Sequence, residues 1–489
     1  MKLKIKRLKF SAGRPVCMIH EKEAEKISLH PGHRVVIRKG KKRIISIVNL
    51  NSTGKTNEIA VSDEIVKHLK LKTKDLVEIK TTQRPQSINL IKKKLSGEEL
   101  SKKEIFKIVN DIARNALTEA EISFFISAVH SNGMSLIETK YLIQAMVKSG
   151  SQLKLRGKVV DKHCIGGVAG NRTTPIVVSI CAALGLKTPK TSSRAITSAA
   201  GTADVIETVA RVDFSIRELK KIINKTNACF VWGGALGLAP VDDKIIKVER
   251  IVKIDSTAQL LASILSKKIS VDSKYVLIDI PFGPSAKVTK KQAKELKRKF
   301  LNLGRKFDLK LDVVLTDGSE PIGRGVGPIL EMIDVINVLK GDKDAPKDLR
   351  EKSIMLAGKL IGLARKTKKG QGRKLAKKIL DSGKAFKKFE QIIEAQKGKI
   401  KTLKPGKYSH EIKSKEKIKI KHLNNKLINS LARQAGCPED KPAGIYLYKK
   451  KGEIVKRGEK IMTIYATSKE KLRYANNFYN KNKKQMIRY

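Results

Sequence analysis

One stretch of the sequence combines glycines, a lysine and a helix start in a pattern suited to anions. Residues 161–175 read DKHCIGGVAGNRTTP and run into the apolar segment PIVVSICAALGL. We expect Thr174 to be the N-cap and Pro175 the first residue of a helix. Backbone N–H groups of the Gly166–Gly167 turn would then face an anion at that N-terminus, and Lys162 adds a full positive charge. An ordinary strand-to-helix turn, with glycines for its tight geometry, is the alternative interpretation.

A second loop of similar character follows about 30 residues later. The segment TPKTSSRAITSAAGTADVIE surrounds Arg194 with hydroxyl side chains, namely Thr191, Ser192, Ser193, Thr197, Ser198 and Thr202. Arg194 offers a planar fork that can bind a phosphate through two hydrogen bonds, and Thr202 is placed to cap the next helix. Hydroxyl-rich loops are often simple turns. Two anion-ready loops so close together nevertheless favour phosphate binding.

The segment KIDSTAQLLASILSKK supplies a candidate acid. Ser256 and Gln259 form a capping box, so a helix begins here. Ser263 and Lys267 are four residues apart and share one face of that helix. Asp255 precedes the cap, where a carboxylate can simply complement the helix dipole. A helix N-terminus lowers a carboxyl pKa, whereas a general acid needs a raised one, so burial beside bound phosphate would have to reverse the balance.

Four stretches of different texture carry these motifs. Residues 1–84 read as a small β-rich domain with a strand–turn–strand at RVVIRKGKKRIISIV. Residues 88–157, with parts of the following segment, read as a helical domain. Residues 158–400 alternate helices with strands such as KYVLIDIPFG and LKLDVVLTDG, which is typical of a central α/β domain. Residues 405–489 read as a C-terminal α+β domain that ends in a helix. The sequence therefore predicts a multidomain protein of the α/β and α+β class.

The charge of the chain raises a different class of function. Lysine and arginine number 104 against 47 acidic residues, which gives a formal net charge of +57. Such a chain is a candidate for nucleic-acid binding, but its basic residues occur in every segment without a zinc-finger or RNP-type motif. A lysine-rich solvated surface with non-specific affinity for polyanions is the simpler interpretation. No apolar run reaches the ~18 residues of a membrane span, and scattered cysteines fit a reducing cytoplasm.

The motifs, taken in order, resemble the thymidine and pyrimidine nucleoside phosphorylase family, and within it the archaeal AMP phosphorylases. The resemblance covers the whole chain and rests on DKHCIGGVAGNRTTP, SSRAITSAAGTAD, WGGALGLAPVDDKII, IDS…LLASILSKK and DGSEPIGRGVGPILE. It implies a helical, a central α/β and a C-terminal α+β domain, with the active site in the cleft between the first two. It also implies that residues 1–84 are an extra domain linked to multimer assembly, and hence a homo-oligomer, which the cysteine pattern places in the cytoplasm.

The resemblance implies a role for each matching residue. Asp255 corresponds to the proton donor for the leaving base. The phosphate-binding positions are Lys162, Gly166 and Ser192. The positions that contact the nucleotide are Gly167, Ser193, Arg194, Ala195, Ile196, Thr197, Ser198, Thr202, Ser263 and Lys287, and Lys267 falls where pyrimidine phosphorylases hold the base. Two positions depart from the thymidine pattern, because Cys164 replaces a phosphate-binding serine and Val248 replaces a base-binding arginine.

Together these features predict phosphorolysis of AMP, and of nucleoside 5′-monophosphates such as CMP and UMP, by inorganic phosphate. Phosphate would attack C1′ of the ribose while Asp255 protonates the leaving base, which gives the free base and ribose 1,5-bisphosphate. The resemblance implies no cofactor, and no residue set suggests a metal site. Two alternatives stay open: a thymidine or pyrimidine nucleoside phosphorylase of the same fold, and a basic nucleic-acid-binding protein on an inactive scaffold.

Overall fold

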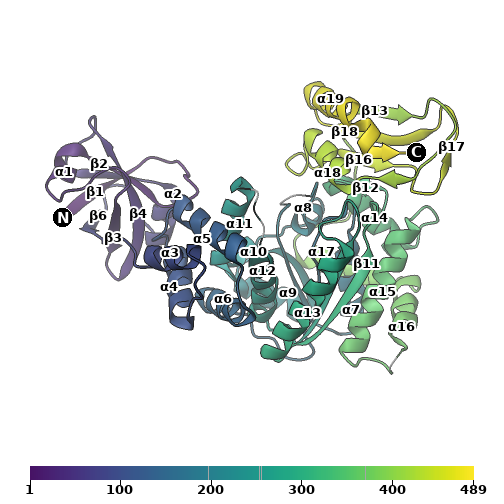
Figure 1. The fold of residues 1–489 in the computed structure, drawn as a ribbon, viewed down its shortest axis with the longest axis horizontal. Helices are drawn as coiled ribbons and strands as arrows, with labels where there is room; N and C mark the ends of the chain where they lie inside the picture. Colours follow the sequence, from purple (N-terminus) through teal and green to yellow (C-terminus); the bar gives the residue numbers. More distant parts are fainter. Residues whose placement is uncertain (196–197, 253, 255, 369) are drawn as a thin grey trace. The chain divides into compact units, whose positions relative to one another are not determined.

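The computed structural model describes residues 1–489 except 196–197, 253, 255 and 369. By its internal contacts the chain forms two compact units (Figure 1). Unit 1 comprises Met1–Gly150 and Pro240–Ser263, and unit 2 comprises Ser151–Ala239 and Ile264–Tyr489. The chain thus leaves unit 1, builds part of unit 2, returns to unit 1 for one segment and ends in unit 2. The finer four-domain boundaries given above remain predictions.

Unit 1 begins with a closed β-barrel whose strands follow the order β1-β5-β2-β4-β3-β6. The strands are Lys2–Arg7 (β1), Val16–His20 (β2), Arg34–Lys39 (β3), Lys42–Asn51 (β4), Glu58–Val61 (β5) and Leu76–Thr81 (β6), with the short helices Glu21–Glu25 (α1) and Asp63–Leu69 (α2). Alternation along β1 buries Leu3 and Ile5 and exposes Lys2, Lys4 and Lys6. The predicted strand–turn–strand is confirmed, since β3 and β4 pair antiparallel around Gly40 at φ +56°.

The rest of unit 1 is helical, as predicted. Its helices are Ser87–Leu95 (α3), Lys102–Ala113 (α4), Glu119–Asn132 (α5), Leu136–Ser149 (α6) and Pro240–Val252 (α11), with the first part of Thr257–Ser270 (α12). α4, α5 and α6 each begin with a capping box, in which the N-cap hydroxyl and a glutamate three residues later accept hydrogen bonds from each other's backbone. These bonds satisfy N–H groups that the first turn of a helix leaves without partners.

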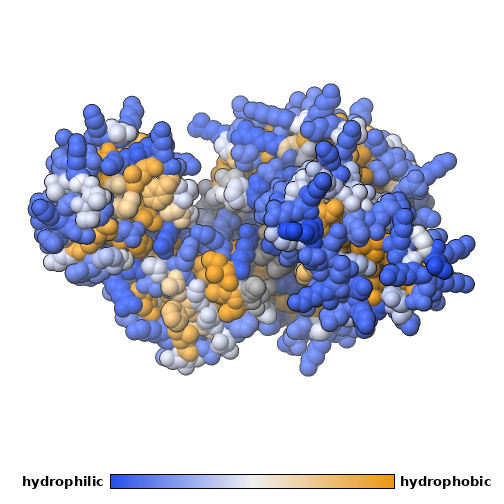
Figure 2. Space-filling model, turned by 90° about the horizontal axis from the view of Figure 1, so that it is seen from above, coloured by the Kyte–Doolittle hydropathy of each residue, from blue (hydrophilic) through white to orange (hydrophobic). Residues whose placement is uncertain are grey.

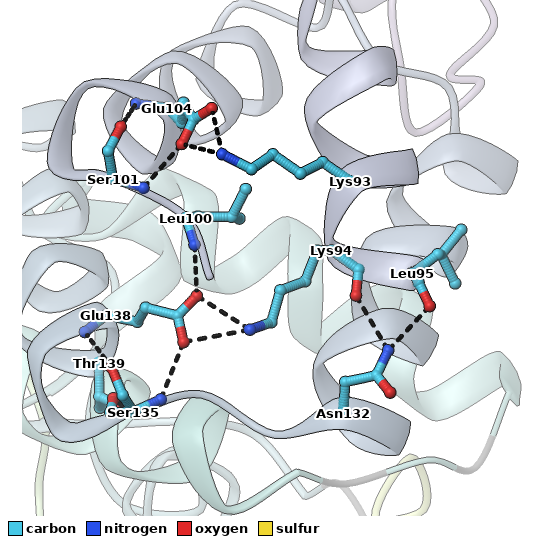
Figure 3. A network of polar contacts seen from close by, with 10 residues as sticks. All are labelled: Lys93, Lys94, Leu95, Leu100, Ser101, Glu104, Asn132, Ser135, Glu138 and Thr139. Carbon is cyan, nitrogen blue, oxygen red and sulfur yellow. Dashed lines mark hydrogen bonds and ion pairs between the residues drawn. The ribbon is translucent and has the colours of Figure 1, made fainter. Parts of the chain in front are cut away.

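A buried ion pair joins α3 to α6 (Figure 3). Lys94 Nζ lies 2.9 Å from Glu138 Oε1, and both side chains are almost fully buried. The backbone N–H groups of Leu100 and Ser135 donate to the two oxygens of the same carboxylate, each at 2.9 Å. One ammonium therefore faces one carboxylate whose remaining acceptor capacity is used by the backbone, which is the condition under which a buried pair is tolerated.

Unit 2 is built on parallel strands. They are Val160–Cys164 (β7), Thr188–Ser192 (β8), Ala228–Trp232 (β9), Tyr275–Phe282 (β10) and Lys310–Asp317 (β11). β11, β10 and β7 form one sheet in that order, and β8 and β9 form a second pair. A parallel bridge between Val159 and Lys187 joins β7 to β8. β10 and β11 are the two strands predicted from KYVLIDIPFG and LKLDVVLTDG.

Helices surround these strands. They are Thr173–Ala183 (α7), Thr202–Ile206 (α8), Ile216–Thr226 (α9), Gly233–Leu236 (α10), Lys290–Lys306 (α13), Pro328–Lys340 (α14), Lys347–Leu363 (α15), Gly372–Asp381 (α16) and Lys384–Ala395 (α17). α7 is buried over all but its last residue, and both α15 and α17 pack against it. A helix that is buried on every side belongs to the core, so α7 lies within the main hydrophobic core of unit 2.

Two predicted helix starts need correction. α7 begins at Thr173, so Thr174 lies inside the first turn and Pro175 is the third helical residue, a position where proline costs no helical hydrogen bond. α8 begins at Thr202 after the N-cap Gly201, so Thr202 is not the cap. In both helices the hydroxyl of the first residue accepts a hydrogen bond from a cationic side chain. These threonines serve the neighbouring loops rather than the helix backbone.

The C-terminal part of unit 2 is an α+β arrangement, as predicted. An antiparallel sheet has the order β12-β16-β18-β13. Its strands are Gly325–Val326 (β12), Tyr408–Lys413 (β13), Gly444–Leu447 (β16) and Lys460–Ala466 (β18). Two short strand pairs are Ile418–Lys419 (β14) with Ile454–Val455 (β17), and His422–Leu423 (β15) with Ile487–Arg488 (β19). The helices are Asn425–Gln434 (α18) and Lys469–Met486 (α19). β12 precedes α14 in the chain, so the central part of unit 2 contributes an edge strand to this sheet.

Hydrophilic residues cover most of the surface in view in Figure 2. Exposed lysines occur in every part of the chain, for example Lys4, Lys103, Lys291 and Lys484. The positive charge is therefore distributed along the whole molecule, as the simpler interpretation of the composition predicts. The predicted fold class, with a β-rich start, a helical part, parallel α/β strands and a C-terminal α+β part, is confirmed.

Candidate active site

Three loops that carry predicted site residues follow the carboxyl ends of parallel strands. The first loop (165–172) follows β7, the second loop (193–201) follows β8, and the third loop (283–289) follows β10. The chain leaves β7 towards β8 on one side, whereas β10 and β11 lie on the other side of β7. Open α/β sheets bind ligands at the carboxyl ends beside such a reversal of strand order. The fold thus places the loops where a ligand is expected.

Gly167 brings the first and third loops into contact. It has a φ of +87°, and a Cβ built on it would lie 2.5 Å from the backbone nitrogen of Lys287. Both the conformation and the close approach require glycine. Gly166 precedes it at φ +88°. Three residues assigned from the sequence, Gly166, Gly167 and Lys287, therefore lie together.

Cys164 ends β7 directly before the first loop. Its Sγ accepts a hydrogen bond from the N–H of Gly166 at 3.5 Å and from Asn171 Nδ2 at 3.4 Å. Burial raises the pKa of this thiol, and the nearby carboxylate of Asp279 raises it further. A thiol with a raised pKa is a poor nucleophile at neutral pH. Cys164 thus acts as a neutral acceptor within the loop.

Lys162 is fully buried beneath the first loop. Its Nζ donates to Thr173 Oγ1 at 2.7 Å and lies 3.9 Å from Asp279 Oδ2. Burial lowers the pKa of this ammonium, because the charged form loses its hydration. Thr173 Oγ1 accepts from the ammonium, so the hydroxyl keeps its own proton for donation. A direct contact between Lys162 and phosphate stays a prediction.

A buried lysine cluster underlies this loop. It consists of Lys162, Lys190, Lys268 and Lys352 with Asp161 and Asp279, and none of these side chains is more than 8% exposed. Asp161 lies 3.1 Å from Lys190 Nζ and 2.5 Å from Lys268 Nζ. Asp279 lies 3.2 Å from Lys352 Nζ. Four lysines thus face two carboxylates, which leaves a surplus of positive charge in this described part of the chain.

The pKa shifts in the cluster follow from this surplus. Burial lowers the pKa of Lys268, since the single carboxylate of Asp161 compensates it only in part. Burial alone would raise the pKa of Asp279, but the ammoniums of Lys352 and Lys162 hold it below its usual value. Burial also lowers the pKa of His163, and the surrounding lysines add to the effect, so its imidazole is neutral. A bound anion would relieve the shortage of negative charge.

Arg194 in the second loop has partners that the sequence did not reveal. Its guanidinium donates to both oxygens of Glu207 at 2.7 and 2.6 Å and to Asp204 Oδ1 at 3.2 Å. It also lies 5.0 Å from the ring centre of Trp232. The hydrogen bond to Glu207 raises the pKa of Arg194. Carboxylates therefore occupy the fork that was assigned to a phosphate, and a phosphate contact of Arg194 stays a prediction.

Asp204 and Arg172 hold the second loop in place. Asp204 Oδ2 accepts the backbone N–H groups of Ala195 at 2.7 Å and Gly201 at 2.8 Å. Arg172 donates to Thr202 Oγ1 at 2.8 Å and to the carbonyl of Ala200 at 2.7 Å. Arg172 lies at the end of the first loop, so it ties the two loops together. The bond also leaves the Thr202 hydroxyl proton available for another acceptor.

The other predicted site residues have more local surroundings. Ser192 Oγ donates to the carbonyl of Val231 at 3.3 Å, and Ser198 Oγ donates to the carbonyl of Ala200 at 2.9 Å. Ser263 and Lys267 lie one turn apart on α12, as expected, and Gln259 N–H donates to Ser256 Oγ at the start of that helix. Asp255, Ile196 and Thr197 lie outside the described residues. Ser193 and Ala195 lie in the second loop, where a Cβ on Gly201 would touch their backbone.

Sequence reasoning missed the residues that support the loops. Lys190, Lys268, Lys352 and Asp279 bear charge inside buried strands and helices, and Arg172 follows a glycine loop. A signal was present for Asp279, since an aspartate interrupts the apolar run VLIDIP. A charge in a buried strand needs a partner, but the sequence does not show which lysines supply it.

The described residues show neither a metal-binding cluster nor a membrane-spanning helix. They contain no group of three or more histidine, cysteine or carboxylate side chains arranged to hold a metal ion. No helix among them has both the length and the apolar character needed to cross a membrane.

Three segments of the chain match domains of known protein families. Residues 88–150 match the helical bundle domain of a glycosyl transferase family, and residues 156–299 match its α/β domain. Residues 419–484 match the C-terminal domain of pyrimidine nucleoside phosphorylases. The solved anthranilate phosphoribosyltransferase of Thermus thermophilus shares the fold, with a TM-score of 0.53 and 18% identity over 63% of this chain and 99% of that one.

Full-length relatives are more similar. The AMP phosphorylase of Thermococcus kodakarensis is 43% identical over 478 residues, which cover 96% of this chain and 95% of the relative. The AMP phosphorylase of Methanocaldococcus jannaschii is 41% identical over 463 residues, or 94% and 92% of the two chains. Identity at this level, sustained over nearly the whole length, identifies a common family. The chain therefore belongs to the nucleoside phosphorylase family that includes the AMP phosphorylases.

Proposed function

We propose that this chain cleaves AMP with inorganic phosphate to give adenine and ribose 1,5-bisphosphate. The observation that carries the proposal is the buried lysine cluster, in which four lysines face only two carboxylates. It lies beneath a glycine loop, and a second anion-ready loop stands beside it. The AMP phosphorylases among its relatives support AMP as the substrate.

The first loop is the proposed site of the attacking phosphate. The positive charge of the buried lysines attracts a phosphate dianion, and this attraction is strong because the interior has a low dielectric constant. The Thr173 hydroxyl, which accepts a hydrogen bond from Lys162, can donate its proton to one phosphate oxygen. Successive glycines at 166 and 167 leave backbone N–H groups unobstructed by side chains. Phosphate held in this way is positioned rather than chemically activated, which accounts for a large share of the rate in such a reaction.

The second loop is the proposed site of the nucleotide. Its own cation, Arg194, is paired with Glu207. Asp204 and Asn429 already accept three of the loop's backbone N–H groups. Hydroxyls such as that of Thr202 and the other backbone N–H groups are the proposed donors to the 5′-phosphate and ribose. Thr202 is fixed for this purpose by Arg172. A substrate with a 5′-phosphate and a phosphate nucleophile requires two anion sites, and this molecule offers two adjacent loops for them. The alternative, a nucleoside phosphorylase, requires only one.

With phosphate in the first loop and AMP in the second, the proposed reaction is a single displacement at C1′ of the ribose. A phosphate oxygen forms a bond to C1′ as the bond from C1′ to adenine N9 breaks, and the electron pair leaves with the base. Asp255 donates a proton at N7, so that adenine departs neutral. General acid catalysis of this kind contributes roughly 10²–10⁴-fold. Lysines and backbone donors stabilise the phosphate while the ribose passes through an oxocarbenium-like state.

Release of adenine from AMP and from adenosine, each with and without inorganic phosphate, tests the proposal on wild type and Asp255→Asn. We expect release from AMP only when phosphate is present, and a loss of roughly 10²-fold or more in the variant. Equal release from adenosine would favour the nucleoside phosphorylase. No release from either, together with nucleic-acid binding that resists salt, would favour the binding protein.

The proposal extends to the oligomeric state and the cellular compartment of the chain. We infer that the chain is a cytoplasmic homo-oligomer, with residues 1–84 contributing to assembly. Sedimentation equilibrium of the full chain tests the assembly, and a mass equal to the 54.3 kDa monomer at micromolar concentration would contradict it.

A further inference from the structure

Helix α18 of the C-terminal part reaches the loops of the proposed site through two asparagines. Asn425 and Asn429 are four residues apart and therefore share one face of the helix. Both are buried, at 0% and 7% exposure, whereas Lys426 beside them is exposed. Buried amides on a helix face need partners, and both side chains find theirs in the loops of the proposed site.

Asn425 connects three loops at once. Its Oδ1 accepts the backbone N–H of Ala169 in the first loop at 3.0 Å. Its Nδ2 donates to Ser285 Oγ in the third loop at 3.3 Å and to the carbonyl of Gly318, just after β11, at 3.0 Å. Its own backbone N–H also donates to Ser285 Oγ, at 3.1 Å. A single side chain thus sets the spacing between the loops that follow β7, β10 and β11.

Asn429 holds the second loop by a hydrogen bond of the same kind. Its Oδ1 accepts the backbone N–H of Ala199 at 3.0 Å. Ala199 and Ala169 are both essentially inaccessible to water, so each N–H depends on its asparagine for an acceptor. The two loops are therefore held from the same helix, one turn apart, by equivalent bonds.

We propose that Asn425 and Asn429 are positioning residues of the phosphorolysis site, through which the C-terminal part of the chain sets the geometry of both anion loops. The inference rests on the proposed function. Neither asparagine is assigned a contact with substrate. Asn425 holds the first loop, so its larger effect is on inorganic phosphate, whereas Asn429 holds the second loop, so its larger effect is on AMP.

Because the two asparagines hold different loops, their substitution should affect the KM values for phosphate and AMP unequally, whereas a general loss of structure would raise both alike. In Asn425→Ala we expect the KM for phosphate to rise about tenfold and the KM for AMP to rise less, since Asn425 also holds the third loop that carries Lys287. In Asn429→Ala we expect the larger rise in the KM for AMP. Ser430→Ala is the matched control, since its hydroxyl bonds within the helix, to the carbonyl of Lys426 at 2.9 Å, and both constants should stay at wild-type values. Parallel rises of both constants in both variants would overturn the proposal.

Hydrogen exchange separates this inference from the proposed function, because it needs no substrate. In Asn429→Ala the amides of residues 193–201 should exchange about tenfold faster while those of residues 165–172 keep their protection, and in Asn425→Ala the order should reverse. If AMP is not a substrate, this pattern still supports the positioning role. If Asn425→Ala does not fold, Asn429→Ala decides alone, and unchanged exchange at 193–201 would overturn the proposal.

Discussion

Two buried ionic networks in this molecule differ in their balance of charge. In unit 1, Lys94 faces Glu138, and backbone N–H groups complete the carboxylate's hydrogen bonds (Figure 3). In unit 2, the buried lysine cluster sets four lysines against the carboxylates of Asp161 and Asp279. The first network is complete within the protein. The second has a surplus of positive charge that an anion from solution would balance.

The difference leads us to interpret the network of unit 1 as structural and to propose a binding role for that of unit 2. A balanced buried pair contributes mainly to the integrity of its surroundings, since removing one partner strands the other. A surplus of buried cations is unfavourable in the free protein and is relieved by the ligand, so its effect should appear in binding rather than in stability. Single substitutions in either network test this interpretation.

The largest effect is expected from Glu138→Ala. It leaves the ammonium of Lys94 buried without a counter-charge and should lower the free energy of unfolding by about 3–5 kcal/mol. Glu104→Ala removes the neighbouring, half-exposed partner of Lys93 and a capping bond, and should cost only about 1 kcal/mol. Urea unfolding measures both. If both variants keep wild-type stability, the view of this pair as structural fails.

Lys162→Met should have the next largest effect, on catalysis. Removal of the ammonium that polarises Thr173 is expected to lower kcat/KM for phosphate by roughly 10²–10³-fold. Steady-state kinetics with varied phosphate at saturating AMP measure it. Melting should stay near that of wild type, because the variant removes a cation from a site that has too many. A loss of stability without a loss of activity would contradict the functional interpretation of the cluster.

Lys352→Met should have a smaller effect of the same kind. Asp279 keeps the Thr316 hydroxyl at 2.6 Å and Lys162 at 3.9 Å, so the fold should tolerate the change. We expect the KM for phosphate to rise about tenfold with little change in the KM for AMP. Lys359→Met on the exposed side of the same helix is the control for the loss of one positive charge. Equal effects of the two variants would point to long-range surface charge instead.

The smallest predicted effect concerns pH. Burial lowers the pKa of Lys162 and Lys268 below the ordinary lysine value of 10.5, so both lose their charge at a lower pH than exposed lysines. The KM for phosphate should therefore rise on the alkaline side, starting well below pH 10.5. His163, whose pKa is lowered, stays neutral as this happens, and Cys164, whose pKa is raised, loses its proton at a higher pH than an ordinary thiol. A flat profile up to the ordinary lysine range would contradict these shifts, and Lys359→Met should match wild type.

Much of the fold was readable from the sequence, because period and turn residues are local signals. The hairpin about Gly40, the helices of unit 1 and the strands β10 and β11 follow from patterns a few residues long. The partners of charged residues were not readable. Arg194 was assigned to phosphate from its loop, whereas Glu207 and Asp204 meet it only through the turn into α8. Asn425 lies 256 residues from Ala169, and no local pattern links them.

Calorimetric titration of inorganic phosphate into the free protein tests the central claim most directly. If the buried surplus of positive charge forms the phosphate site, wild type should bind one phosphate per chain, and Lys352→Met should bind it about tenfold more weakly with Lys359→Met unchanged. Absence of phosphate binding by wild type, or equal affinity in Lys352→Met, would contradict the account.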